Sequence, residues 1–129
     1  SDGKMLRSKS ELLIYQRLID KGLQPLYEKQ LEFKEVAKLP DFTIENEESG
    51  EIYYWEHCGM MHDSEYKARW EEKYKWYIEN KILPFEAGGG KNGTLIITED
   101  IPKKIEDGTL RGAISVKEID ELIKNVFKI

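Results

Sequence analysis

The chain has one cysteine, Cys58, among its 129 residues, so it can form no internal disulfide and no four-cysteine zinc site. No apolar run approaches the roughly 20 residues that cross a bilayer, and no secretion signal is recognisable at the start. These absences favour a cytoplasmic protein. The length predicts one domain over residues 1–129, with residues 1–6 expected to be disordered or a cloning remnant.

A surplus of basic residues is also missing, because the formal net charge is −5. Proteins that grip nucleic acid through general electrostatics usually carry positive charge, so any such contact here must be local. An enzyme that places a divalent cation between its own carboxylates and a phosphate tolerates an acidic balance, since the cation supplies positive charge.

Hydrophobic periodicity predicts three helices, over residues 8–21, 63–80 and 115–127. The inward stripe of the first helix is predicted to hold Leu12, Tyr15, Leu18 and Ile19. Four strands are predicted at residues 26–33, 41–46, 51–58 and 94–98. The order gives an α/β fold, in which a mixed sheet of a three-strand meander and a further strand is flanked by helices.

The turn between the second and third strands fixes a hairpin register. If the turn is centred between Glu48 and Ser49, cross-strand partners have numbers that sum to 97, which places Asp41 opposite Glu56. Facing carboxylates about 5 Å apart repel each other unless a cation lies between them. Mg²⁺ or Mn²⁺ suits such a site, because these ions prefer oxygen ligands.

Two further side chains are predicted to face the same place. Glu11 lies on the same helix face as Tyr15 and Leu18 in the first helix, so it is a candidate third carboxylate. Lys73 lies on an aromatic stripe of the long helix, where a group of carboxylates is the obvious partner for its ammonium. Both have structural alternatives: Ser8 and Glu11 match a capping box, and Lys73 can extend its ammonium to solvent.

The ordered set resembles the PD-(D/E)xK nuclease superfamily, which has the restriction-endonuclease-like fold. The resemblance rests on Glu11, Pro40-Asp41, Glu56 and the helix that carries Lys73. Within the superfamily, the chain also resembles nuclease domains that accompany bacterial helicases or ATPases. The likeness lies in Arg7-Ser8-Lys9-Ser10-Glu11, Pro40-Asp41-Phe42, Tyr54-Trp55-Glu56-His57, Gly59-Met60, and Trp70, Lys73, Trp76 and Tyr77.

The resemblance implies that Glu11, Asp41 and Glu56 hold the metal and that a lysine assists catalysis. The usual lysine position, two residues after the last acid, is occupied by Cys58. In relatives with a displaced lysine the amine comes from the following helix, which favours Lys73 over Lys75.

Other motifs predict little chemistry. His57, Cys58 and His62 lack the spacing and the fourth ligand of a closed zinc site. The segment Gly88-Gly89-Gly90-Lys91 lacks the serine or threonine of a P-loop and leads into a strand, so we expect a loop near the substrate instead.

The sequence therefore predicts a hydrolase that cuts the phosphodiester bonds of DNA, with RNA also open, as an endonuclease or an exonuclease. One alternative is a nuclease-like module of a larger helicase or ATPase that binds nucleic acid without turnover. Another is a domain that only docks a partner protein.

Overall fold

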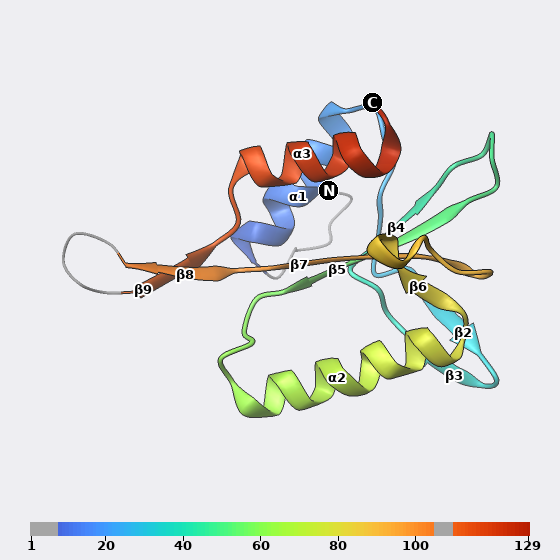
Figure 1. Ribbon diagram of the computed structural model, residues 1–129, viewed down its shortest axis with the longest axis horizontal. Helices are drawn as coiled ribbons and strands as arrows, with labels where there is room; N and C mark the ends of the chain where they lie inside the picture. Colours follow the sequence, from blue (N-terminus) through green and yellow to red (C-terminus); the bar gives the residue numbers. More distant parts are fainter. Residues whose placement is uncertain (1–7, 105–109) are drawn as a thin grey trace.

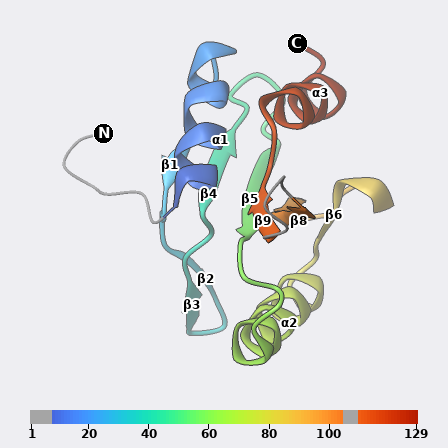
Figure 2. The ribbon, with the colours of Figure 1, turned by 90° about the vertical axis from the view of Figure 1, so that its left-hand side faces the viewer.

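Three layers make up the molecule, with helices on both faces of one mixed sheet (Figures 1 and 2). The computed structural model describes residues 8–104 and 110–129, with side chains described outside 101–113. Helices α1 (Lys9–Asp20) and α3 (Val116–Phe127) cover one face, and α2 (Ser64–Glu79) covers the other. The predicted α/β class with flanking helices is confirmed. The expectation for residues 1–6 lies outside the described residues.

Local signals explain where each helix begins. Ser8, Asp63 and Ser115 are the N-caps of α1, α2 and α3, and each side chain accepts a hydrogen bond from a backbone N–H of the first turn. Helix α1 ends before Gly22, whose φ of +86° is easily adopted by glycine. All three helices lie within one or two residues of their predicted bounds.

The five-stranded sheet has the order β1-β4-β5-β7-β6. Its strands are β1 (Leu26–Tyr27), β4 (Phe42–Glu45), β5 (Ile52–Cys58), β7 (Gly93–Glu99) and β6 (Ile82–Pro84). The first three strands are antiparallel neighbours, whereas β7 runs parallel to both β5 and β6. The meander followed by a helix and a further strand is thus confirmed. Helix α2 forms the crossover that leads from β5 to β6.

The predicted strand over residues 26–33 is wrong in extent. Glu28 has a φ of +50°, which breaks the extended backbone after β1. The chain then forms a small separate hairpin of β2 (Leu31–Phe33) and β3 (Val36–Lys38) before it returns to the sheet at β4. Four strands and a short 3-10 helix lie outside the predicted elements: β3, β6, β8 (Ile101–Lys104), β9 (Leu110–Ala113) and η1 (Phe85–Ala87).

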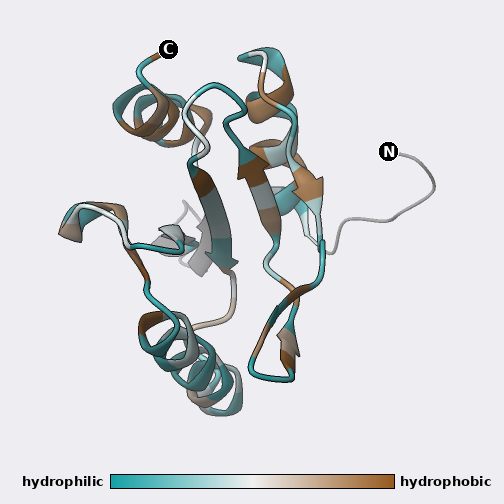
Figure 3. Cartoon of the chain, turned by 90° about the vertical axis from the view of Figure 1, so that its right-hand side faces the viewer, coloured by the Kyte–Doolittle hydropathy of each residue, from teal (hydrophilic) through white to brown (hydrophobic). Residues whose placement is uncertain are grey.

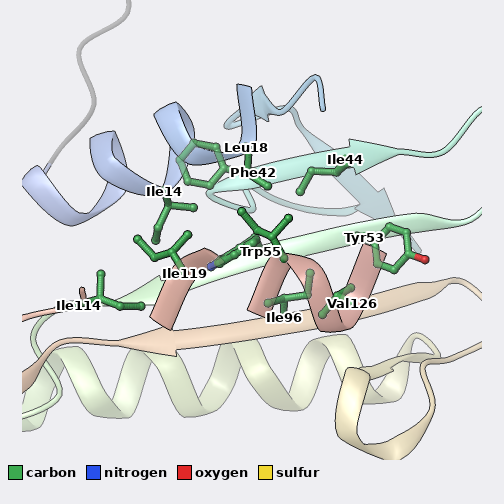
Figure 4. Packing of buried hydrophobic residues seen from close by; sticks show 11 residues of the cluster. Ile14, Leu18, Phe42, Ile44, Tyr53, Trp55, Ile96, Ile114, Ile119 and Val126 are labelled. Carbon is green, nitrogen blue, oxygen red and sulfur yellow. The ribbon is translucent and has the colours of Figure 1, made fainter. Parts of the chain in front are cut away.

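The larger core lies between the sheet and the pair α1 and α3 (Figure 4). Trp55 and Ile96 point up from the central strands toward Ile14 and Leu18 of α1 and Ile119 of α3. Each such side chain contributes about 1.5–3 kcal/mol through burial. The predicted stripe of α1 is partly wrong, because Leu12 and Ile19 are exposed, whereas Ser10 and Glu11 are buried with Ile14 and Leu18.

A smaller core lies under the opposite face, where Tyr54, Ile82 and Leu95 pack against Tyr77 of α2. Tyr77 is the one fully buried residue of α2, and Figure 3 shows most of this helix in teal or pale colours. Side chains alternate along β5, since Tyr53 and Trp55 belong to the α1 face and Tyr54 to the α2 face.

Candidate functional site

The β4–β5 hairpin has the predicted register. Phe42 pairs with Trp55 and Glu45 with Ile52, so partner numbers sum to 97 along the hairpin. Asp41, just before β4, therefore lies across from Glu56 near the end of β5. Its Oδ2 accepts a hydrogen bond of 2.7 Å from the backbone N–H of His57. This hydrogen bond joins the start of β4 to the end of β5 beside the two acids.

Glu56 is 4% exposed and points toward α2. Its Oε2 accepts a hydrogen bond of 2.6 Å from the Tyr77 hydroxyl and lies 2.6 Å from Lys73 Nζ. Lys73 Nζ also donates to the carbonyl oxygen of Leu39 at 2.8 Å. The predicted placement of Lys73 beside a carboxylate is confirmed, and its ammonium bridges β5 to the segment that precedes Asp41.

Both facing acids hold their protons more tightly than ordinary carboxyl groups. Burial, together with the charge of Asp41, raises the pKa of Glu56 to about 7 against the lowering effects of Lys73 and Tyr77. Burial also raises the pKa of Asp41, against the lowering effects of the His57 N–H and Lys73. The site therefore has too little positive charge for two buried carboxylates, which favours the binding of a cation.

Glu11 reaches the same place from the first turn of α1. It is 7% exposed, and its Oε2 lies 3.4 Å from the Tyr27 hydroxyl, which donates to it. Its backbone N–H donates to Ser8 Oγ at 3.1 Å, so the capping interaction is present as well. The half of the capping box that runs through Ser8 is thus present, and Glu11 also lines the pocket described next.

A pocket of about 450 Å³ gathers these groups between the beginnings of α1 and α2. Glu11, Asp41, Glu56 and Lys73, the four predicted site residues, all line it. The remaining lining residues are Ser8, His57, Cys58, Gly59, Met60, Tyr66, Arg69 and Trp70. The wall thus combines three carboxylates with cationic and aromatic side chains of α2.

The donor set fits a hard divalent cation held by two carboxylates. Among the described residues, none donates a hydrogen bond to Asp41 Oδ1 or Glu56 Oε1, so one oxygen of each acid remains available. Mg²⁺ commonly takes one or two carboxylates and completes its shell with water and phosphate oxygens. No three His, Cys, Asp or Glu side chains in the described ranges are close enough to hold an ion by themselves. Glu11 as a third ligand stays a prediction.

The remaining sequence candidates have structural roles or none. Cys58 is buried, and burial together with Glu56 and Asp41 raises the pKa of its thiol to about 12, so it stays a neutral thiol beside the acids. His62 is exposed and His57 is buried on the opposite face from Cys58. The loop of Gly88 to Lys91 does not line this pocket, and its expected place near the substrate stays a prediction. This loop precedes β7, whereas the pocket lies at the other end of the parallel strands.

Sequence reasoning missed two groups that contact the acids. Tyr77 belongs to the smaller core, and its hydroxyl is a direct partner of Glu56; its place four residues after Lys73 on one helix face was the available signal. The backbone N–H of His57 was also missed, although its position follows from the hairpin register.

The chain is similar to a protein of Methanocaldococcus jannaschii that is described as uncharacterized, with 30% identity over 80 residues. The match takes in 61% of this chain and 7% of that relative, so the chain spans a small part of the relative's length. No family model and no solved structure matches. None of the helices in the described ranges has the length and apolar content of a membrane span.

Proposed function

We propose that this chain is a metal-dependent nuclease of the PD-(D/E)xK type, with the restriction-endonuclease-like fold, that hydrolyses phosphodiester bonds of DNA. One observation carries the proposal: Asp41 and Glu56 face each other across a hairpin, with Lys73 Nζ 2.6 Å from Glu56, in a pocket that also holds Glu11. The mixed sheet with helices on both faces is compatible with this fold.

Asp41 and Glu56, with Glu11 on the same wall, would hold the Mg²⁺ or Mn²⁺ ion. The bound ion would acidify a water molecule and neutralise charge on the phosphate. Hydrolysis forms a bond from the water oxygen to phosphorus and breaks the bond from phosphorus to one ester oxygen, which leaves as a hydroxyl after protonation. Lys73 stabilises the negative charge that develops on the phosphate, because its ammonium already lies at the carboxylate pair.

The absence of lysine from its usual position in the motif is consistent with a catalytic role for Lys73. Cys58 stands where the superfamily usually has lysine, and its buried thiol is uncharged at neutral pH. Lys73 projects from α2 toward the carboxylate of Glu56 and is half-buried, with 24% of its side chain exposed. Lys75, the other candidate on this helix, is exposed.

Cleavage of supercoiled plasmid and of single-stranded DNA, with Mg²⁺, Mn²⁺ or EDTA, tests the proposal. Asp41→Asn and Glu56→Gln should abolish cleavage, whereas Asp20→Asn and Glu45→Gln, the same changes at exposed acids, should not. Lys73→Met should reduce the rate strongly and Lys75→Met should not. Equal cleavage by wild type and the Asp41 and Glu56 variants would overturn the proposal.

The principal alternative is a nuclease-like module, of a larger helicase or ATPase, that binds nucleic acid without cutting it. Calorimetry with Mn²⁺ and with an oligonucleotide separates the two functions. Binding of both ligands without cleavage by any divalent ion would favour the module. No shift in melting temperature with either ligand would favour a domain that docks a partner protein.

A further inference from the structure

A buried polar cluster, outside the pocket except for His57, lies where β5 and β7 end, on the face that α1 covers. The His57 side chain is 1% exposed, and both of its ring nitrogens have partners. Nδ1 lies 2.8 Å from Thr98 Oγ1 and Nε2 lies 3.0 Å from Asp100 Oδ1. Ser10 of α1 donates to the same Asp100 Oδ1 at 2.7 Å, and Trp55 Nε1 donates to Thr98 Oγ1 at 3.0 Å.

The available donors and acceptors give one consistent set of hydrogen-bond directions with a neutral His57 ring. Thr98 Oγ1 accepts from the Trp55 indole, which has a donor only, so the threonine hydroxyl is free to donate to His57 Nδ1. Nε2 then carries the ring proton and donates to Asp100. Every polar atom of the His57 ring is used within the cluster, so this histidine is neither a metal ligand nor a base for the substrate.

Ser10 is not placed as the nucleophile of a hydrolytic triad. In such a triad the histidine lies between the hydroxyl and the carboxylate and takes the proton from the hydroxyl. Here Asp100, and not a histidine, accepts the hydrogen bond from Ser10. The Thr98 hydroxyl does lie next to His57, but Thr98 is buried and does not line the pocket of the acids. A nucleophilic role for Ser10 is therefore not supported.

The members of the cluster are instead connected to all three acids of the pocket. Ser10 directly precedes Glu11 on α1, and His57 directly follows Glu56 on β5. The backbone N–H of His57 holds Asp41 Oδ2 at 2.7 Å. Asp100 is the joint between these segments, because it accepts from both Ser10 and His57, and its own N–H donates to the Cys58 carbonyl at 3.2 Å.

We propose that Asp100 and His57, together with Ser10, are positioning residues that fix α1 and the end of β5 so that Glu11, Asp41 and Glu56 face one shared cation. This inference rests on the proposed function. Groups that hold metal ligands in place typically change metal affinity by roughly 10- to 100-fold when removed, although they do not contact the metal.

Asp100→Ala removes both hydrogen bonds at the joint and leaves the three acids unchanged. Asp100→Asn is the conservative variant, because the amide oxygen can accept from Ser10 and from His57 as Oδ1 does now. Arg17→Met is the matched control for loosening α1: it breaks the 2.8 Å ion pair with Asp120 of α3 and touches no cluster member. Two readouts are Mn²⁺ affinity by calorimetry and amide hydrogen exchange at His57 in metal-free protein.

We expect Asp100→Ala to weaken Mn²⁺ binding by roughly 10- to 100-fold. Asp100→Asn should restore most of the affinity, and Arg17→Met should leave it unchanged despite a lower melting temperature. Exchange of the His57 amide should accelerate in Asp100→Ala more than exchange of the Trp55 amide, because the contact with Asp41 loosens. Unchanged affinity in Asp100→Ala, or an equal loss in Arg17→Met, would overturn the proposal.

The two readouts separate this inference from the proposed function. If the wild-type protein itself binds no Mn²⁺, the nuclease proposal fails. The positioning role of the cluster is then tested by hydrogen exchange at the His57 amide alone. Selective acceleration at His57 in Asp100→Ala would then still support a positioning role for the Asp41 contact. Exchange identical to wild type would overturn it.

Discussion

Replacing Glu56 by glutamine should stabilise the metal-free protein at alkaline pH. Glu56 is buried, and its pKa of about 7 lies above the ordinary value of 4.5. Between these two values the folded protein keeps a proton that the unfolded chain has released. The free energy of unfolding therefore falls as pH rises through this window, and stability is greatest below it.

The size of the effect follows from the two pKa values. They differ by about 2.5, and one pKa unit corresponds to about 1.4 kcal/mol, so ionised Glu56 costs the folded state about 3 kcal/mol above pH 7. Glutamine resembles the protonated acid in shape and charge, and its oxygen can still accept from Tyr77 and Lys73. The cost should therefore vanish in Glu56→Gln.

Urea unfolding followed by circular dichroism at pH 4.5 and pH 8, with EDTA present, measures this difference. Wild type and Glu56→Gln should be equally stable at pH 4.5, and the variant should be about 3 kcal/mol more stable at pH 8. Glu45→Gln, at an exposed carboxylate paired with Lys29, should change stability by less than about 1 kcal/mol at either pH. A Glu56→Gln variant no more stable than wild type at pH 8 would refute the reasoning.

Three further changes test individual contacts of the site and of the fold by urea unfolding or thermal melting. Tyr77→Phe should cost about 1.5–3 kcal/mol with Glu56 ionised, because it removes the hydroxyl that donates at 2.6 Å to this carboxylate; no loss at pH 8 would contradict the contact. Ser115→Ala should cost about 1 kcal/mol, since its side chain caps α3 through the Glu118 N–H, and it should leave DNA cleavage unchanged. Gly90→Ala should cost on the order of 1–3 kcal/mol, because a Cβ there would lie 2.2 Å from the carbonyl oxygen of Lys81. Thermal melting unchanged in Gly90→Ala would show that the loop adapts.

The parts of the fold that sequence predicted well are those governed by local rules. The short turn between Glu47 and Gly50 fixes the register of β4 against β5, and hence the placement of Asp41 opposite Glu56. Helical spacing alone puts Lys73 on the same side of α2 as Tyr77. Both inferences need no knowledge of distant segments.

The parts that sequence missed depend on contacts between distant segments. Ser10 occupies a buried position of α1, where its hydroxyl bonds to Asp100, whereas Leu12 and Ile19 are exposed. The apolar pattern of the helix therefore predicted its inward face only in part. The partners of His57 come from the end of β7, more than 40 residues away, and meet it only through the parallel pairing of β5 with β7. The break at Glu28 depends on a positive φ, which the sequence does not indicate because the residue there is not glycine.

Crystals soaked in Mn²⁺ test the central claim most directly, through anomalous diffraction at the manganese absorption edge. The account predicts one strong peak within coordination distance of Asp41 Oδ1 and Glu56 Oε1, with Glu11 on the same side of the ion. The peak should disappear in Glu56→Gln crystals and persist in Glu45→Gln crystals. A wild-type pocket without a peak, with Lys73 still paired to Glu56, would contradict the account.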